Sequence, residues 1–187
     1  MDADELVRWA EAQASGLLSG TGDRWRHVQA VAAKAAEIGS TLDDQDRAAL
    51  ISAAWLHDVG YAPELAATGF HPVDGARYVR DHGHERVAAL VAHHSGARLE
   101  AEERGMADEL AEFEPVDGPL MDALIYADMT TGPAGQPVSF EERITDILRR
   151  YPPNDPVHRA ITRARPMLRA AVERIRRRLD GLANQPM

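Results

Sequence analysis

Apolar residues recur three and four positions apart along most of the chain. Val28, Val31, Ala35 and Ile38 form one such series. This spacing matches the 3.6-residue turn of an α-helix and places the apolar side chains on one face. Alternating runs of β-branched residues, which would indicate strands, do not extend beyond a few positions. The pattern therefore predicts an all-α fold, a helical bundle of about eight or nine helices.

Several predicted helix boundaries have sequence signals of their own. Asp43 and Ser139 stand where a side chain can cap a helix, and Pro72 suits a first helical turn. Gly60 is expected to end a helix in a left-handed conformation, and Pro166 to kink or split the last helix. The predicted helices span residues 2–18, 24–38, 43–59, 72–82, 84–95, 98–113, 117–131, 139–150 and 156–179.

Length and composition set the broad class. The chain has 187 residues, which suits a single domain over residues 1–187. It contains no cysteine, so disulfides, thiolate metal ligands and cysteine nucleophiles are excluded. The acidic N-terminus differs from the basic start of a signal peptide, and the apolar runs are shorter than a membrane span. We therefore expect a soluble, cytoplasmic protein with no membrane partner.

The charge of the chain limits the kinds of partner that it is expected to bind. The formal net charge is −9, whereas binding to duplex nucleic acid requires a basic surface. The arginine-rich segment 163–179 is a local exception, and its spacing is typical of the solvated face of a long helix. We therefore expect a small-molecule partner and no duplex nucleic acid. An exposed face of the same helix would allow a homodimer.

Histidines and aspartates occupy positions where the helical pattern places apolar residues. Asp128, for example, follows Met121, Leu124 and Ile125 on one stripe. A buried ionisable group is costly unless it is paired or binds a metal. For one such residue, a hydrogen-bonded core histidine or a capping aspartate is the commoner explanation, but recurrence on successive helices favours a shared cation. The candidate metal ligands are His27, His57, Asp58, His71, His93, His94 and Asp128.

The order of these residues resembles the HD superfamily of metal-dependent phosphohydrolases. A His is followed about thirty residues later by a His-Asp pair at a helix end, and a distal Asp ends an "LIYAD" run. The resemblance covers roughly residues 24–132, with further helices over about 139–180. It implies that one metal ion is bound by His27, His57, Asp58 and Asp128.

Two further segments extend the resemblance. "HPVDGA", starting at His71, is similar to the HPxxGA segment of many HD proteins, and "AHHSG" is similar to the histidine motif that follows it. The likeness implies that Asp58 bridges two ions and that His71 and His94 bind the second ion. His94 has the better helical phase and ranks above His93. The sequence leaves open whether the centre holds one ion or two.

One position departs from the family pattern. Many HD proteins read His-Asp-x-Gly-Lys, and that Lys can contact substrate phosphate, whereas this chain has Tyr61 at the Lys position. Arginine is suited to replace it, because its planar guanidinium can bind two phosphate oxygens. Arg24 and Arg98 rank beside Asp58 as catalytic residues. Arg26, Thr130 and Thr131 are further candidates, and each of these five could equally be a surface or capping residue.

The ligand set indicates the chemistry. Imidazole and carboxylate groups suit a divalent transition metal: Mn, Fe, Co, Ni or Zn. Such an ion activates a bound water and polarises a phosphoryl oxygen. The leading hypothesis is a phosphohydrolase acting on a small phosphomonoester or nucleotide-type substrate. Two alternatives stay open: a di-iron oxygenase with the HD fold, and a non-catalytic regulatory module that binds a metal or a nucleotide.

Overall fold

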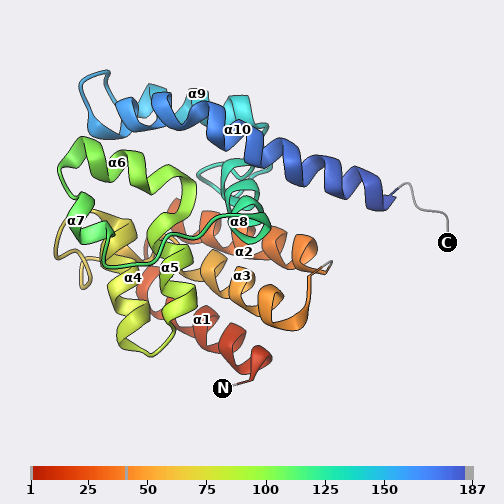
Figure 1. Ribbon diagram of the computed structural model, residues 1–187. Coiled ribbons are helices and arrows are strands. Elements are labelled where there is room, and N and C mark those ends of the chain that lie inside the picture. Colours follow the sequence, from red (N-terminus) through yellow and green to blue (C-terminus); the bar gives the residue numbers. More distant parts are fainter. Residues whose placement is uncertain (1, 41, 184–187) are drawn as a thin grey trace.

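Helices form the regular structure of this protein. The computed structural model describes residues 2–40 and 42–183, and within these ranges there is no strand, so the predicted all-α class is confirmed (Figure 1). No helix in the described ranges is long and apolar enough to cross a bilayer. The α-helices are α1 (Ala3–Leu18), α2 (Asp23–Gly39), α3 (Asp44–Leu56), α4 (His71–Asp81), α5 (Glu85–His93), α6 (Ala97–Arg104), α7 (Ala107–Leu110), α8 (Pro119–Met129), α9 (Phe140–Arg150) and α10 (Pro156–Ala183).

Three predicted helix starts are confirmed by their hydrogen bonds or geometry. The Asp43 carboxylate accepts a hydrogen bond from the backbone N–H of Asp46 at 2.9 Å. Ser139 and Glu142 form a capping box at the start of α9. Pro72 stands in the first turn of α4, where no intrahelical N–H bond is lost. These boundaries depend on local chemistry, which is why the sequence was sufficient to place them.

Other boundaries differ from the prediction. The third helix ends at Leu56 and is followed by a short 3-10 helix, η1 (Val59–Tyr61). The predicted helix 98–113 divides into α6 and α7, because Gly105 adopts a left-handed φ of 70°. The last helix is not split at Pro166 but runs through it. Contacts of α10 with α6 and α8 hold both halves in place, which offsets the backbone hydrogen bond that a proline removes.

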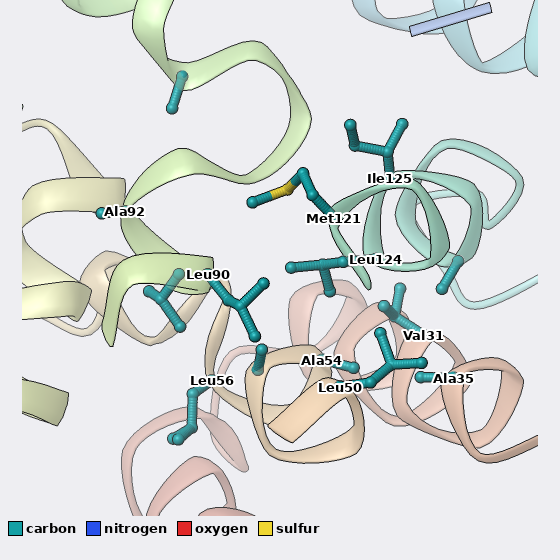
Figure 2. Packing of buried hydrophobic residues seen from close by; sticks show 14 of the residues in the cluster. Val31, Ala35, Leu50, Ala54, Leu56, Leu90, Ala92, Met121, Leu124 and Ile125 are labelled. Atoms are coloured by element: carbon teal, nitrogen blue, oxygen red, sulfur yellow. The ribbon is translucent and has the colours of Figure 1, made fainter. Parts of the chain in front are cut away.

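The hydrophobic core lies between α2, α3, α5 and α8. Side chains from these four helices meet in Figure 2, where Leu124 of α8 lies among residues of the other helices. Leu50, Leu90 and Leu124 are fully buried. Burial of a leucine side chain contributes roughly 1.5–3 kcal/mol to the stability of the fold. Packing of these side chains therefore holds the four helices, and with them their ends, in place.

Gly60 allows the backbone of η1 to lie directly against the backbone of α4. The prediction of a left-handed conformation at this residue was wrong. Its φ is not positive, and it lies inside η1. A Cβ atom added at Gly60 would lie 2.0 Å from the backbone oxygen of His71 and 2.7 Å from the backbone nitrogen of Gly75. Only a glycine lets the backbone of η1 pack directly on the first turns of α4. This contact brings the chain after α3 beside the start of α4.

Acidic side chains of neighbouring helices pair with the arginine-rich face of α10. Arg163 contacts Glu102 and Glu103 of α6, each at 2.7 Å. Arg174 donates two hydrogen bonds of 2.6 Å to Asp122 of α8. These arginines are about half-exposed, as the sequence predicts for an outer face. They also tie α10 to the helices beneath it (Figure 1).

Candidate metal centre

Six of the predicted ligands lie close together, at or near helix ends. Five of these side chains are buried and that of His71 is partly buried. Their positions follow from helices that pack side by side, so that residues distant in sequence share one site. They are His27 in α2, His57 and Asp58 at the end of α3, His71 at the start of α4, His94 after α5, and Asp128 in the last turn of α8.

The first ligand group consists of His27, His57 and Asp128. Each offers one ligand atom, and these atoms all lie within 4.8 Å of one another. The Nε2 atom of His27 lies 3.2 Å from Oδ1 of Asp128. All three side chains are buried. The group therefore has the composition and spacing of a site for one cation.

The second ligand group consists of Asp58, His71 and His94, whose ligand atoms also lie within 4.8 Å of one another. Oδ1 of Asp58 lies 3.5 Å from Nε2 of His71, and the Nε2 atoms of His71 and His94 are 3.3 Å apart. Oδ2 of Asp58 lies 3.6 Å from Nε2 of His57, which belongs to the first group. Asp58 thus contacts both groups, one with each carboxylate oxygen.

Backbone carbonyls set the tautomer of three histidines. The Nδ1–O distances are 3.0 Å for His27 with Gly132, 2.8 Å for His57 with Ala54, and 2.6 Å for His94 with Val91. Because a carbonyl oxygen only accepts, Nδ1 carries a proton, and in the neutral form of the ring this leaves the lone pair on Nε2. Nε2 of His57 is buried with no hydrogen-bond partner among the described residues. An oriented, unprotonated Nε2 is the form in which histidine binds a metal, so these residues fit a cation.

The two aspartates are ionised despite their burial. Burial by itself raises the pKa of Asp58, but the positive charge of Arg24 opposes this effect, and the pKa lies well below its ordinary value. The pKa of Asp128 is likewise raised by burial, but the positive charge of Arg143 helps to lower it well below the ordinary value. Two ionised carboxylates beside unprotonated imidazole nitrogens provide the negative charge that a divalent ion requires.

Burial acts on two of the histidines in a way that predicts a pH dependence. It lowers the pKa of His57 and of His71 below the ordinary 6.5. Just below pH 6.5 the unfolded chain therefore binds protons that the folded chain does not. The metal-free protein is expected to lose stability as the pH falls through about 6.5. Urea denaturation in the presence of a chelator, between about pH 7.5 and pH 5.5, measures this dependence.

A variant connects that pH dependence to the centre. The His71→Gln protein lacks one of the two titrating groups, so its free energy of unfolding should fall less steeply over the same pH range. Equal slopes for the wild-type and variant proteins would contradict the assignment to His71. A stability that rises as the pH falls would contradict the direction of both pKa shifts.

Arg24 lies beside the centre as predicted. Its Nη1 atom donates a hydrogen bond to Oδ2 of Asp58 at 2.5 Å. Its guanidinium also lies over the ring of Tyr61, 3.7 Å from the ring centroid. Tyr61 in turn stacks on His71, with ring centroids 4.0 Å apart. The residue at the family's Lys position therefore contacts both an arginine and a candidate ligand.

The structure does not bring His93 or Arg98 to the centre. Adjacent helical residues point about 100° apart, and Nε2 of His93 lies 3.0 Å from the backbone oxygen of Phe113 instead. The side chain of Arg98 is 70% exposed and pairs with Glu102 one turn later in α6. Neither residue lines the cavity beside the two ligand groups.

Three further candidates make local contacts instead. Arg26 pairs with Asp23 in the same helical turn, and both side chains are exposed. The hydroxyl groups of Thr130 and Thr131 donate to backbone carbonyls in α8, each at 2.7 Å. Thr130 also accepts a hydrogen bond from Lys34 at 2.8 Å. These contacts correspond to the surface and capping roles that the sequence left open.

Two residues of the site were not singled out from the sequence. Ser95 has a φ of 47°, a costly conformation for a residue with a side chain, and its hydroxyl donates to Oδ2 of Asp128. Arg143 of α9 donates from Nη2 to Oδ1 of Asp128 at 3.4 Å. The "HHSG" segment placed Ser95 near the motif, but Arg143 lies early in an ordinary amphipathic helix and gave no signal.

A cavity of about 100 Å³ lies directly beside the ligand groups. One part of its wall belongs to the centre, including Asp58, His71 and Asp128. Another part comes from α9, α10 and the segment between them, which together contribute both basic and apolar side chains. Beyond the candidate ligands, the lining includes Arg24, Tyr61, Arg143, Ile147, Arg150, Tyr151 and Ile161.

The fold and the site define an all-α protein with histidine and aspartate groups at helix ends that could hold a metal ion. A family model described as "HD domain" matches residues 24–148, which is more than half of the chain, and the chain belongs to this family. The family binds divalent metals and consists mostly of metal-dependent hydrolases. The searches of curated proteins and of solved structures found no match. The resemblance stated from the sequence is thereby confirmed.

Proposed function

We propose that this protein is a phosphohydrolase that uses two divalent transition-metal ions and acts on a small phosphomonoester or nucleotide-type substrate. The main support for this proposal is that two ligand groups lie side by side and that Asp58 contacts both of them. A cavity lined by arginines lies next to them. Two-metal hydrolytic sites require two adjacent ligand sets with a shared group. A cationic cavity wall suits a phosphorylated substrate.

The side chains have distinct tasks in this proposal. His27, His57 and Asp128 would hold one ion, and Asp58, His71 and His94 would hold the other. A bound divalent ion supplies an activated water and polarises a phosphoryl oxygen. The backbone carbonyls that fix three of the imidazoles keep Nε2 of each directed into the site. Arg24 has further N–H groups besides the one that contacts Asp58, and these would bind phosphate oxygens.

An assay of phosphate release tests this function. The protein loaded with Mn²⁺, Co²⁺ or Ni²⁺ is expected to release phosphate from p-nitrophenyl phosphate, a nucleoside monophosphate or triphosphate, or a dinucleoside polyphosphate. The His94→Gln variant loses a candidate ligand and should lose at least about 100-fold of this activity. The His93→Gln variant is the matched control, because this neighbouring histidine lies outside the centre. Its activity should equal that of the wild type.

The other outcomes have definite meanings. No phosphate release from any of these substrates by the metal-loaded protein would contradict the proposal. In that case, oxygen consumption by an iron-loaded sample would favour an oxygenase with the same ligand set. If the protein shows neither phosphate release nor oxygen consumption, a regulatory binding module would be favoured. Equal losses of activity in the His93 and His94 variants would contradict the assignment of ligands.

A further inference from the structure

Arg143 has a buried guanidinium that the protein itself satisfies only in part. The residue is 9% exposed and lies in the first turn of α9. Its Nη2 atom makes a long hydrogen bond of 3.4 Å to Asp128. The Nε and Nη1 atoms are buried without a hydrogen-bond partner among the described residues. A guanidinium is always charged and has only donors, so this side chain has N–H groups that no acceptor among the described residues uses.

Another arginine of this protein shows what a purely structural pairing looks like. Arg174 donates two hydrogen bonds of 2.6 Å to the two oxygens of Asp122, and its side chain is half-exposed. Arg143 is more deeply buried and has one long contact in place of two short ones. Burial of a charge with unsatisfied donors is costly. The difference is explained if Arg143 is kept in place to bind a ligand.

The position of Arg143 indicates what the ligand is. Arg143 of α9 and Arg24 of α2 both line the cavity beside the centre. Arg24 contacts Asp58 of the second ligand group, whereas Arg143 contacts Asp128 of the first. Glu100 also lines the cavity, but its carboxylate is paired with Arg104 at 2.7 Å. The cavity therefore has a cationic donor next to each ligand group.

We infer that Arg143 binds the phosphoryl group of the substrate on the Asp128 side of the centre, while Arg24 binds it on the Asp58 side. This inference rests on the proposed function. The cavity of about 100 Å³ is smaller than the roughly 300–1,000 Å³ of pockets that enclose a drug-sized ligand. It encloses a terminal phosphoryl group, and the organic part extends past Tyr61, which is 40% exposed. The substrate class is a compound with a terminal phosphoryl group.

A purely structural role for Arg143 makes a different prediction. If its only task were to hold Asp128, its removal would weaken metal binding, and phosphate affinity would fall only as metal was lost. If it binds the phosphoryl group, the metal content is preserved and phosphate affinity falls. The two roles are therefore separated by measuring metal content and phosphate binding in the same samples.

Titration of inorganic phosphate into the full-length, Mn²⁺-loaded protein tests the inference without requiring turnover. Calorimetry gives the dissociation constant, and elemental analysis gives the manganese content. The Arg143→Gln variant is expected to bind phosphate about 10- to 100-fold more weakly than the wild type, with unchanged manganese content. Arg143→Lys keeps the charge and should show a smaller loss. Arg149→Gln is the matched control from the same helix, since that side chain is 81% exposed, and it should behave as the wild type.

Each other result overturns the inference in an identifiable way. Phosphate binding by the wild type with equal affinity in Arg143→Gln would overturn it and leave the proposed hydrolase intact. A loss of manganese in Arg143→Gln, at unchanged folding by circular dichroism, would assign Arg143 to the support of Asp128. If Arg143→Gln does not fold, Arg143→Lys decides the question, and wild-type affinity in that variant overturns the inference. No phosphate binding by the wild type would overturn this inference and the proposed function together.

Discussion

Replacement of Asp58 by alanine is expected to remove most of the bound metal and, with it, the proposed phosphohydrolase activity. Oδ1 of Asp58 lies 3.5 Å from Nε2 of His71, and Oδ2 lies 3.6 Å from Nε2 of His57. One substitution therefore removes a ligand that both groups share. Loss of a group that merely orients a ligand lowers metal affinity about 10- to 100-fold. Loss of the shared carboxylate should lower it by at least about 100-fold.

The Asp122→Ala variant is the matched control for this experiment. Asp122 is also buried and also pairs with an arginine, Arg174, but it lies outside the two ligand groups. Both variants leave an arginine without its carboxylate partner, so the general cost of breaking an ion pair is similar. Only Asp58→Ala should lose metal, as measured by elemental analysis of folded protein. Full metal content in Asp58→Ala would contradict the role of this residue.

Replacement of Gly60 by alanine is expected to cost about 3 kcal/mol of unfolding free energy, the upper end of the usual cost of overpacking. The added Cβ would lie 2.0 Å from the backbone oxygen of His71. Backbone atoms cannot rotate away as a flexible side chain can, so η1 and α4 must move apart. Because His71 and Asp58 lie on the two sides of this contact, the second ligand group should bind metal more weakly as well.

Gly16→Ala gives the corresponding control for Gly60→Ala. Gly16 is exposed in α1, and a Cβ there would meet no heavy atom within 4 Å among the described residues. Alanine in a helix is favoured over glycine by about 0.5–1 kcal/mol, so this variant should be equally or more stable. Urea denaturation of both variants measures the difference. Wild-type stability of Gly60→Ala would contradict the close packing of η1 against α4.

The sequence predicted the helices well where local chemistry decides their limits. The capping side chains of Asp43 and Ser139 and the position of Pro72 are examples. The prediction was less successful where contacts with distant segments determine the end or the conformation of a helix. The end of α3 at Leu56 and the conformation of Gly60 depend on contact with α4, which no local pattern reveals. The continuity of α10 through Pro166 also depends on its packing against other helices.

The candidate site shows the same division. The candidate metal ligands could be proposed from the sequence because most of them break the apolar pattern of a predicted helix, as Asp128 does, and because their order matches a known family. Arg98 was proposed from its closeness in sequence to His94, but α6 directs it to the surface. Arg143 was missed because its position is set by the packing of α9 beside α8.

Anomalous diffraction at the metal edge, from crystals of the protein grown with Mn²⁺ or Zn²⁺, tests most directly whether these side chains bind metal. We expect one peak among the side chains of His27, His57 and Asp128, and a second peak among those of Asp58, His71 and His94. Absence of any anomalous peak between these six residues, or metal bound only elsewhere on the molecule, would contradict the claim that they form a metal centre.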